Sequence, residues 1–451
     1  MVLRGAFGVT YVPIGIQYWQ GVPYGFDPGF RASNIASTPF QWDGGYPGVT
    51  VPGAKVSTPD STMLYLPSID PHSLNAGYTD NFNIGAQFEV TSNTKLEVTY
   101  VGNRGHRLQD SGLAYNETTP SKFMGLVNSG HFYDFVYDQA SADAAGVKFP
   151  YPGFSNYAFV ATAPFPQVAN FSDTYWFYPN LYIEGFPHGQ SYYNSLIFRV
   201  SKRMAKGLSM DVNYTLSKQQ GDTYTNFGDS YDVGYIQDFT NLAKEAKSLS
   251  VYDQTHVVKG FAVYQLPFGR GHAILGGAGH LLNSLVSGWS VSGLVGYASG
   301  LPLNFGSSNY YWYPAWSTTY VNFSPEALGG RKFDPSNYVR PTTGNPNPSQ
   351  NLYFSPGAAT DPTYGTLGNG PARIGSLRGF GAASEDASIL KYIRMGSDGQ
   401  YSLSLRFEFY NIFNRHSFEN PVTNITDPRF GYVPGAGGDP RQGQFGARFQ
   451  W

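Results

Sequence analysis

The chain has 451 residues, of which 41% are hydrophobic, 17% aromatic and 13% charged, and its formal net charge at pH 7 is −2. This charge gives no general attraction to nucleic acid, and the absence of cysteine excludes a disulfide framework and a thiolate metal site, so we expect neither a nucleic-acid partner nor such sites. No apolar run is long enough for a helical membrane span, whereas the 54 Gly, 35 Tyr and 33 Phe residues indicate strands and loops.

The beginning of the chain lacks the features of an export signal. Met1 is followed at once by a short run with no basic segment, no apolar core and no small-residue cleavage site. We therefore expect this sequence to start inside a larger protein.

Ten β-strands are predicted from the alternation of apolar and polar side chains, which point to opposite faces of a strand. We expect them at residues 2–11, 78–90, 94–103, 190–203, 208–219, 255–267, 287–299, 384–395, 400–414 and 443–451. The pattern is cleanest in 208–219, where the even positions from 208 to 216 are apolar. Two strands are less regular. Around Lys259, apolar residues occupy both the odd and the even positions, and in 384–395 apolar and polar residues do not alternate regularly.

The connections between these strands alternate between long and short. The short ones are 91–93, 204–207 and 396–399, a medium one at 268–286 ends in an amphipathic stretch at 280–286, and the long ones are 12–77, 104–189, 220–254, 300–383 and 415–442. Barrels of bacterial outer membranes have short periplasmic turns and long outer loops. If the C-terminus is periplasmic, every short connection falls on that side of the membrane.

One stretch, Tyr401 to Asn414, indicates the fold class most directly. Leu405 and Phe407 point one way, whereas Arg406 and Glu408 point the other. Strands of soluble proteins usually have about 5 to 6 residues, whereas a strand that crosses a bilayer needs about 9 to 11, apolar toward lipid and polar toward a lumen. We therefore predict an all-β, antiparallel transmembrane β-barrel in the outer membrane of a Gram-negative-type bacterium.

The charges within the predicted strands support this assignment. An Arg or Lys side chain that faces lipid at the bilayer midplane costs about 2 to 4 kcal/mol. Most charged residues in the strands point to the polar face instead, namely Lys95, Glu97, Arg199, Asp211, Arg406, Glu408 and Arg448. Lys202 is an exception, but beside a short turn its ammonium group can reach the interface.

Five segments resemble the barrel of Oar-like TonB-dependent receptors. They are EVTYVGNRGHRL (97–108), YNSLIFRVSKRMAKGLSMDVNYTLSK (193–218), YDQTHVVKGFAVYQLPFGRG (252–271), SGWSVSGLVGYASGLPL (287–303) and LRFEFYNIFNRHSFENP (405–421). The resemblance implies a 22-strand barrel that encloses a plug and is driven by the TonB complex. This sequence has no recognisable plug, TonB-contacting segment or N-terminal extension, so we expect residues 1–451 to be a single partial barrel domain of about ten strands.

Four partners are expected. They are the lipid of the outer membrane, an unknown transported ligand, the barrel assembly machinery through the C-terminal strand that ends at Trp451 and, as the resemblance implies, the TonB complex through the missing plug. We expect no cofactor. We also expect no enzyme activity, since the eight histidines show no zinc-protease spacing and no nucleophile elbow is present. The acidic residues of 222–238 lack the spacing of a calcium loop.

Clusters of aromatic residues in the long loops are the candidate ligand-binding residues. Such rings can stack on sugar faces or anchor another hydrophobic ligand, or they can pack the loops against each other over the barrel mouth. The candidates are Trp176, Tyr178, Tyr311, Trp312, Tyr313 and Trp316.

Three functions remain open from the sequence. The first is the barrel part of a TonB-dependent receptor, with wall and ligand-facing loops. The second is a self-contained outer-membrane pore or adhesin. The third is a secreted carbohydrate-binding β protein, for which the sequence offers no convergent carboxylate pair that would cleave glycans.

Overall fold

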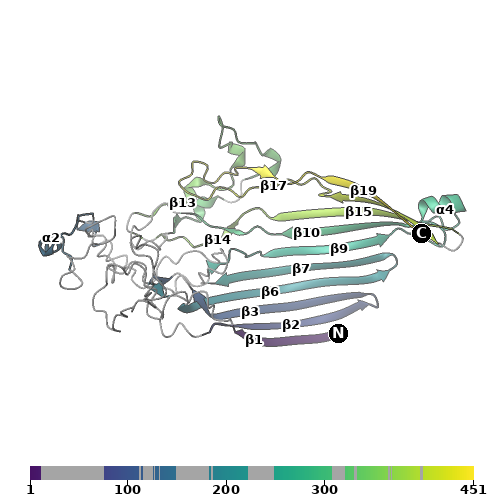
Figure 1. Cartoon of the computed structure of the whole chain (residues 1–451), viewed down its shortest axis with the longest axis horizontal. Coiled ribbons are helices and arrows are strands. Elements are labelled where there is room, and N and C mark those ends of the chain that lie inside the picture. Colours follow the sequence, from purple (N-terminus) through teal and green to yellow (C-terminus); the bar gives the residue numbers. More distant parts are fainter. Residues whose placement is uncertain are drawn as a thin grey trace, which may run out of the picture.

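One antiparallel sheet dominates the molecule, and the described parts of the long connections lie at one end of it (Figure 1). The computed structural model describes residues 1–11, 76–110, 113–114, 125, 127–131, 133–148, 182–183, 186–221, 248–306, 320–329, 333–363, 366, 368–396 and 400–451. None of the helices within these ranges is long and apolar enough to cross a membrane.

Ten strands follow one another across the sheet in chain order, each antiparallel to the next, and the short strand β8 (Ser248–Leu249) pairs with β7 at its edge. They are β1 (Val2–Tyr11), β2 (Tyr78–Thr91), β3 (Thr94–Asp110), β6 (Phe186–Ala205), β7 (Leu208–Gly221), β9 (His256–Gln265), β10 (Trp289–Ala298), β15 (Ala382–Met395), β16 (Tyr401–Tyr410) and β19 (Gln442–Gln450). Each overlaps a predicted strand, although β3 continues seven residues beyond the predicted end at 103 and β6 begins four residues before the predicted start at 190. The prediction was wrong at the end of β16, because Asn411 and Asn414 have φ of +50° and stop the strand four residues early.

The described short turns, between β2 and β3 and between β6 and β7, lie at the end of the sheet that also holds both ends of the chain (Figure 1). Between β6 and β7 the turn is the pair Lys206 and Gly207, with φ of +50° and +78°. Positive φ at both central residues is the geometry that suits the twist of a two-residue hairpin. The connection from β9 to β10 contains helix α4 (His280–Val286), where the sequence predicted an amphipathic stretch.

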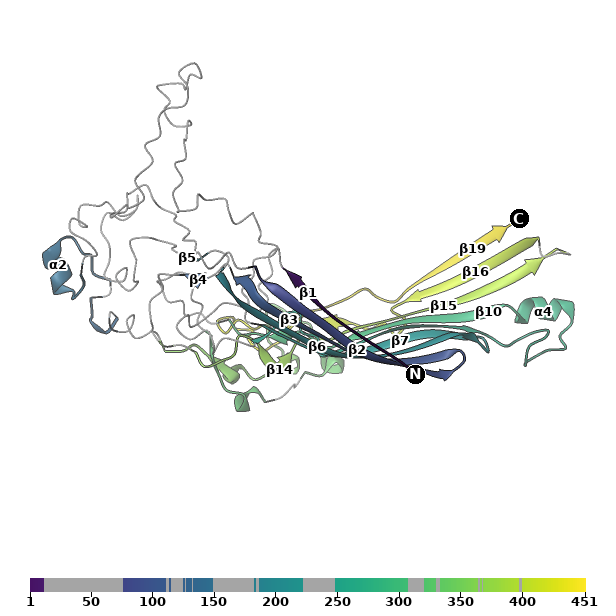
Figure 2. The same cartoon turned by 90° about the horizontal axis from the view of Figure 1, so that it is seen from below.

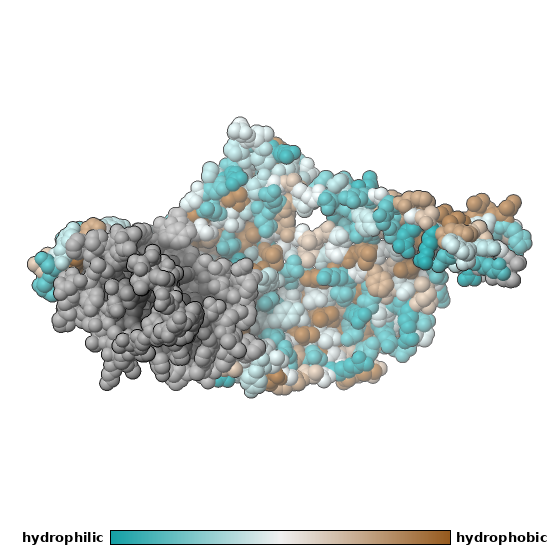
Figure 3. Space-filling model, in the orientation of Figure 1, coloured by the Kyte–Doolittle hydropathy of each residue, from teal (hydrophilic) through white to brown (hydrophobic). Residues whose placement is uncertain are grey.

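Where the pairing is regular, the register assigns the described strand residues to one of two faces, because paired residues point the same way. Lys259 pairs with Asn213 and Gly296, so its ambiguous strand presents it on the polar face. Ile389 pairs with Val291 and Phe407, which puts the irregular strand β15 in register with the apolar face of its neighbours. Figure 3 shows hydrophilic and hydrophobic residues interspersed over the face of the sheet that is turned to the viewer.

The apolar face of the sheet is exposed rather than covered by another layer. Phe7 is 70% exposed, Ile84 65% and Phe445 61%, and Phe407 and Phe409 are each 37% exposed. A face with this much exposed apolar surface requires an apolar surrounding, and lipid supplies one. Figure 2 shows that the sheet is curved, with β1 and β19 as its two edges.

The buried core lies in the long connections instead of the sheet. We call the parts of the β10–β15 and β16–β19 connections that pack together the loop module; it comprises 299–306, 320–329, 333–363, 368–381 and 411–441. Its short elements are β11 (Pro302–Leu303), β12 (Asn322–Phe323), η8 (Glu326–Leu328), η9 (Pro335–Asn337), η10 (Ser349–Asn351), η11 (Pro356–Ala358), β13 (Ala359–Thr360), β14 (Ile374–Arg378), β17 (Ser417–Phe418) and β18 (Ala436–Gly437). The earlier loops contain β4 (Leu113–Ala114), α2 (Gln139–Ala144) and β5 (Tyr182–Ile183).

Candidate functional site

The six aromatic residues predicted to bind ligand, Trp176, Tyr178, Tyr311, Trp312, Tyr313 and Trp316, lie outside the described residues. Their role therefore stays a prediction. The acidic residues of 222–238 lie outside them as well. Within the described ranges, no group of three or more His, Asp or Glu side chains is placed to hold a metal ion.

A concavity of about 410 Å³ lies on the polar face, across strands β9, β10, β15 and β16. Phe261 and Leu294 form its apolar part, and Asp386, Arg406 and Glu408 supply its charges. These residues meet because consecutive strands are in register, with Leu294 paired to both Phe261 and Asp386. The concavity is therefore assembled from segments up to 149 positions apart in the sequence, from Phe261 to Tyr410.

Hydrogen bonds hold the polar side chains of this concavity in place. The Nη1 of Arg406 lies 3.4 Å from Oε1 of Glu408, and the side-chain amide of Gln444 donates to the other carboxylate oxygen of Glu408 and, at 3.2 Å, to the hydroxyl of Tyr410. Asp386 accepts a hydrogen bond from the backbone N of Asn411 at 2.9 Å. Donors and acceptors thus stand side by side, an arrangement that can bind a polar solute by several hydrogen bonds.

The polar face carries a second fixed charge pair, on β6 and β7. Arg199 contacts Asp211 through two nitrogens, with Nε 3.1 Å from both carboxylate oxygens and Nη2 2.8 Å from Oδ2. Glu97 is the register partner of Arg199 on β3. Opposite charges therefore alternate along this face, which suits a hydrated surface rather than a dry core.

A buried ion pair joins two connections and strand β7 at the loop end of the sheet. The side chain of Asp253 is fully buried, and its Oδ2 lies 2.5 Å from Nη2 of Arg378. Arg378 also donates to the carbonyls of Asp253 at 2.8 Å and Gly300 at 3.2 Å, while the backbone N of Gln219 donates to Asp253 Oδ1 at 2.6 Å. We call these contacts the rim clamp. They tie the loop module to the neighbouring β7–β9 connection.

A second charge cluster fixes the start of the β16–β19 connection. Glu385 points to the apolar face of β15, yet it is only 3% exposed. Both of its carboxylate oxygens accept from Nε of Arg415, at 2.8 and 2.7 Å, and the hydroxyl of Tyr297 donates to one of them. The hydrogen bond to Glu385 raises the pKa of Arg415 above its ordinary value, so Arg415 stays charged at physiological pH.

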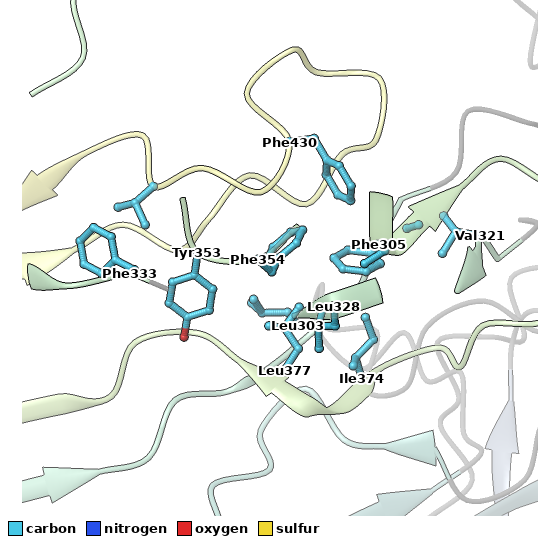
Figure 4. Close-up of a cluster of buried hydrophobic side chains, with 13 residues drawn as sticks. Leu303, Phe305, Val321, Leu328, Phe333, Tyr353, Phe354, Ile374, Leu377 and Phe430 are labelled. Carbon is cyan, nitrogen blue, oxygen red and sulfur yellow. The ribbon is translucent and has the colours of Figure 1, made fainter. Parts of the chain in front are cut away.

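The loop module is held together by aromatic rings (Figure 4). Phe305, Phe354 and Phe430 pack with ring centroids 5.0 to 5.2 Å apart, and Phe354 is fully buried. Tyr353 and Phe333 extend the cluster, and the Tyr353 hydroxyl donates to the carbonyl of Arg378 at 2.5 Å. In this part of the chain, aromatic side chains pack the loops against each other, which is one of the two roles that the sequence left open.

The sequence did not reveal the rim clamp or the Glu385 cluster. Asp253 lies in one of the segments that carry the family resemblance, but nothing in its spacing pointed to Arg378, 125 positions later. The partner of Glu385 could have been anticipated, because Glu385 is a carboxylate on the apolar face of a strand. Such a residue needs a compensating partner.

A model of the outer membrane beta barrel domain family matches residues 1–444 of the chain. No curated protein matches the chain.

Three solved structures are among those similar to the chain. The outer membrane transporter YddB from Escherichia coli shares 9% identity, with 85% of this chain and 33% of that chain covered and a TM-score of 0.35. The ferric citrate transporter FecA in its unliganded form shares 10%, with 84% and 32% covered and a TM-score of 0.33. The ferripyoverdine receptor of Pseudomonas aeruginosa, bound to ferripyoverdine, shares 10%, with 84% and 27% covered and a TM-score of 0.34. The chain thus spans a third or less of the length of these proteins.

Proposed function

Because the chain belongs to the outer membrane beta barrel domain family and so resides in the cell outer membrane, we propose that it forms part of the wall and outer loops of a TonB-dependent transporter. The observation that carries this proposal is the two-faced sheet, with an exposed apolar face and a polar face that holds the concavity of about 410 Å³. The resemblance of five segments to Oar-like receptors supports the same assignment.

In this proposal, residues 1–451 are a single partial barrel domain of a 22-strand barrel. The edges β1 and β19 support this, since in lipid each unpaired backbone group lacks a hydrogen-bond partner. Further strands of the longer protein would pair with both edges. The TonB complex would act through a plug in the same protein, and the barrel assembly machinery would recognise the C-terminal strand that ends at Trp451.

The transported ligand would pass along the polar face and contact the concavity. Arg406, Glu408 and Tyr410 offer donors and acceptors there, so the ligand class that fits is a polar solute with hydroxyl, amide or carboxylate groups. The secreted carbohydrate-binding alternative is not retained, because the chain resides in the outer membrane.

The test uses the full-length gene product in its host, with and without a functional TonB complex. Active transport predicts that uptake of a nutrient too large for general porins is lost without TonB and after addition of a protonophore. A passive pore would give equal uptake in both strains and would conduct ions in a planar bilayer without an energy source. An adhesin would leave uptake unchanged when the gene is deleted.

A matched pair of variants tests the concavity itself. Glu408→Gln removes a charge that lies within the concavity, and Glu89→Gln removes an exposed carboxylate from the same face near a tight turn. We expect lower uptake only for Glu408→Gln, at equal amounts of both proteins in the membrane. Equal uptake by the two variants would contradict a role for the concavity.

The outer-loop aromatics Trp176, Tyr178, Tyr311, Trp312, Tyr313 and Trp316 remain proposed ligand-binding residues. If they bind ligand, alanine at these positions should abolish uptake while barrel assembly stays intact. Loss of assembly with every change would indicate packing instead.

A further inference from the structure

Helix α4 (His280–Val286) exposes leucines at the turn end of the sheet (Figure 1). Leu281 is 85% exposed, Leu285 69% and Leu282 46%. At about 100° per residue, Leu281 and Leu285 point the same way and Asn283 points to the opposite side of the helix. Asn283 is bound there, because its Oδ1 accepts from the backbone N of Arg270 at 2.6 Å. The leucines therefore face away from the protein.

The end of α4 is fixed to the apolar face of the sheet. The carbonyl of Leu285 accepts from Nε1 of Trp289 at 2.8 Å and from Nζ of Lys391 at 3.0 Å, and Lys391 also donates to the carbonyl of Ser287. Trp289 and Lys391 are register partners, and they share a face with the next pair along these strands, Val291 and Ile389. The helix is thus attached on the side of the sheet that carries the exposed apolar residues.

These contacts also explain a lysine on the apolar face. Lys391 is only 3% exposed, and its ammonium group lies 5.2 Å from the ring centroid of Trp289. Two backbone carbonyls at the C-terminal end of α4 accept its hydrogen bonds, where the helix dipole favours a positive charge. Lys391 therefore holds α4 in place. The two carbonyls and the Trp289 ring stabilise its ammonium group in place of water or lipid headgroups.

We propose that α4 lies in the periplasmic interface of the outer membrane and inserts Leu281 and Leu285 among the lipid acyl chains. Helix α4 is attached to the apolar face at the turn end of the sheet, so its exposed leucines extend the apolar surface there, and Trp289 marks the level at which interfacial aromatic residues are found. Ile274 and Leu275, 46% and 49% exposed, add apolar surface in the same connection. A short amphipathic helix of this kind lies in the plane of the interface. The proposal depends on the outer-membrane location and not on transport.

The experiment uses a single introduced thiol, since the chain contains no cysteine. Leu285→Cys and, on the other side of the same helix, the exposed His280→Cys are labelled with an environment-sensitive fluorophore. The protein is inserted into vesicles of phosphatidylethanolamine and phosphatidylglycerol, with nitroxide lipids as the membrane quencher and iodide as the aqueous quencher. Equal protease resistance of both labelled proteins and of the unlabelled one establishes that they are folded, and Leu281→Cys replaces Leu285→Cys if that variant does not insert.

For Leu285→Cys we expect a blue-shifted emission and loss of fluorescence with nitroxide lipids, whereas His280→Cys should lose fluorescence with iodide. Equal quenching of both sites by iodide would place the helix in water and overturn the proposal. Protection of the Leu285→Cys label from both quenchers would also overturn it, because a protein surface would then cover the leucines.

Discussion

Replacement of Arg378 by methionine should release the loop module from the sheet. The substitution keeps an unbranched side chain but leaves the fully buried carboxylate of Asp253 without its positive partner. It also removes donors from the carbonyls of Asp253 and Gly300. Removal of one partner of a buried ion pair costs about 3 to 5 kcal/mol, because an uncompensated charge remains. The backbone N of Gln219 still donates to Asp253, so we expect the lower end of this range.

Hydrogen exchange measured by mass spectrometry on the folded protein would detect this change. A cost of about 3 kcal/mol raises the population of the open loop state by a factor of about a hundred or more. Amides near the clamp, such as those of Ser250 and Gly379, should exchange faster by that factor, whereas those of β16 should not change. Arg429→Met is the matched control, because the pair of Arg429 with Asp427 is partly exposed and such pairs contribute about 0 to 1 kcal/mol.

A double variant separates charge burial from lost packing. Asn at position 253 is neutral and still offers an oxygen to the backbone N of Gln219. In the double variant Asp253→Asn with Arg378→Met, the amides near the rim clamp should therefore exchange more slowly than in Arg378→Met alone. If Arg378→Met changes exchange no more than Arg429→Met does, the rim clamp does not hold the loop module, and the reasoning is refuted.

The remaining predictions concern the loop module and the turn end. Phe354→Ala removes a fully buried ring and should destabilise the loop module by about 3 to 5 kcal/mol, seen as faster proteolysis of the module with an intact sheet; unchanged proteolysis would contradict the packing role. Gly207→Val should lower the free energy of unfolding by about 1 to 3 kcal/mol, seen as a lower denaturation midpoint, because φ is +78° and an added Cβ would lie 2.7 Å from the carbonyl oxygen of Gln265. Arg429 lowers the pKa of Asp427, so this contact contributes fully above the unfolded pKa and weakens only as pH falls through the lowered folded value. The Arg429 Nε–H resonance should thus stay constant from about pH 5 to 8 and shift only in stronger acid.

The strands could be predicted because their signal is local. Alternation over ten residues decides both the presence of a strand and its faces, and a residue with positive φ such as Asn411 decides where the strand ends. The end of β16 at Asn411 was not predicted, because Asn tolerates a positive φ without requiring it. The first and last strands, Val2–Tyr11 and Gln442–Gln450, were placed to within one residue.

The charged residues on the apolar face of β15 could not be explained from the sequence. The partner of Glu385 is Arg415, 30 positions later, and the carbonyl that accepts from Lys391 belongs to Leu285, 106 positions earlier. Their contacts arise only when distant segments meet. For the same reason the concavity could not be predicted, because it needs the register of four strands at once. The irregular period of β15 reflects these two charges on the apolar face and also Leu390 and Tyr392, which lie on the polar face.

The shared core of the loop module has a consequence for loop exchange. Phe305 comes from the connection after β10 and Phe430 from the connection after β16, and each ring lies against Phe354. A chimera that took only one of these connections from a related protein would leave half an aromatic interface facing water. The two segments should therefore be transplanted as a pair, and natural variants should differ in both together. Surface diversity on this side of the molecule is then inherited in blocks rather than loop by loop.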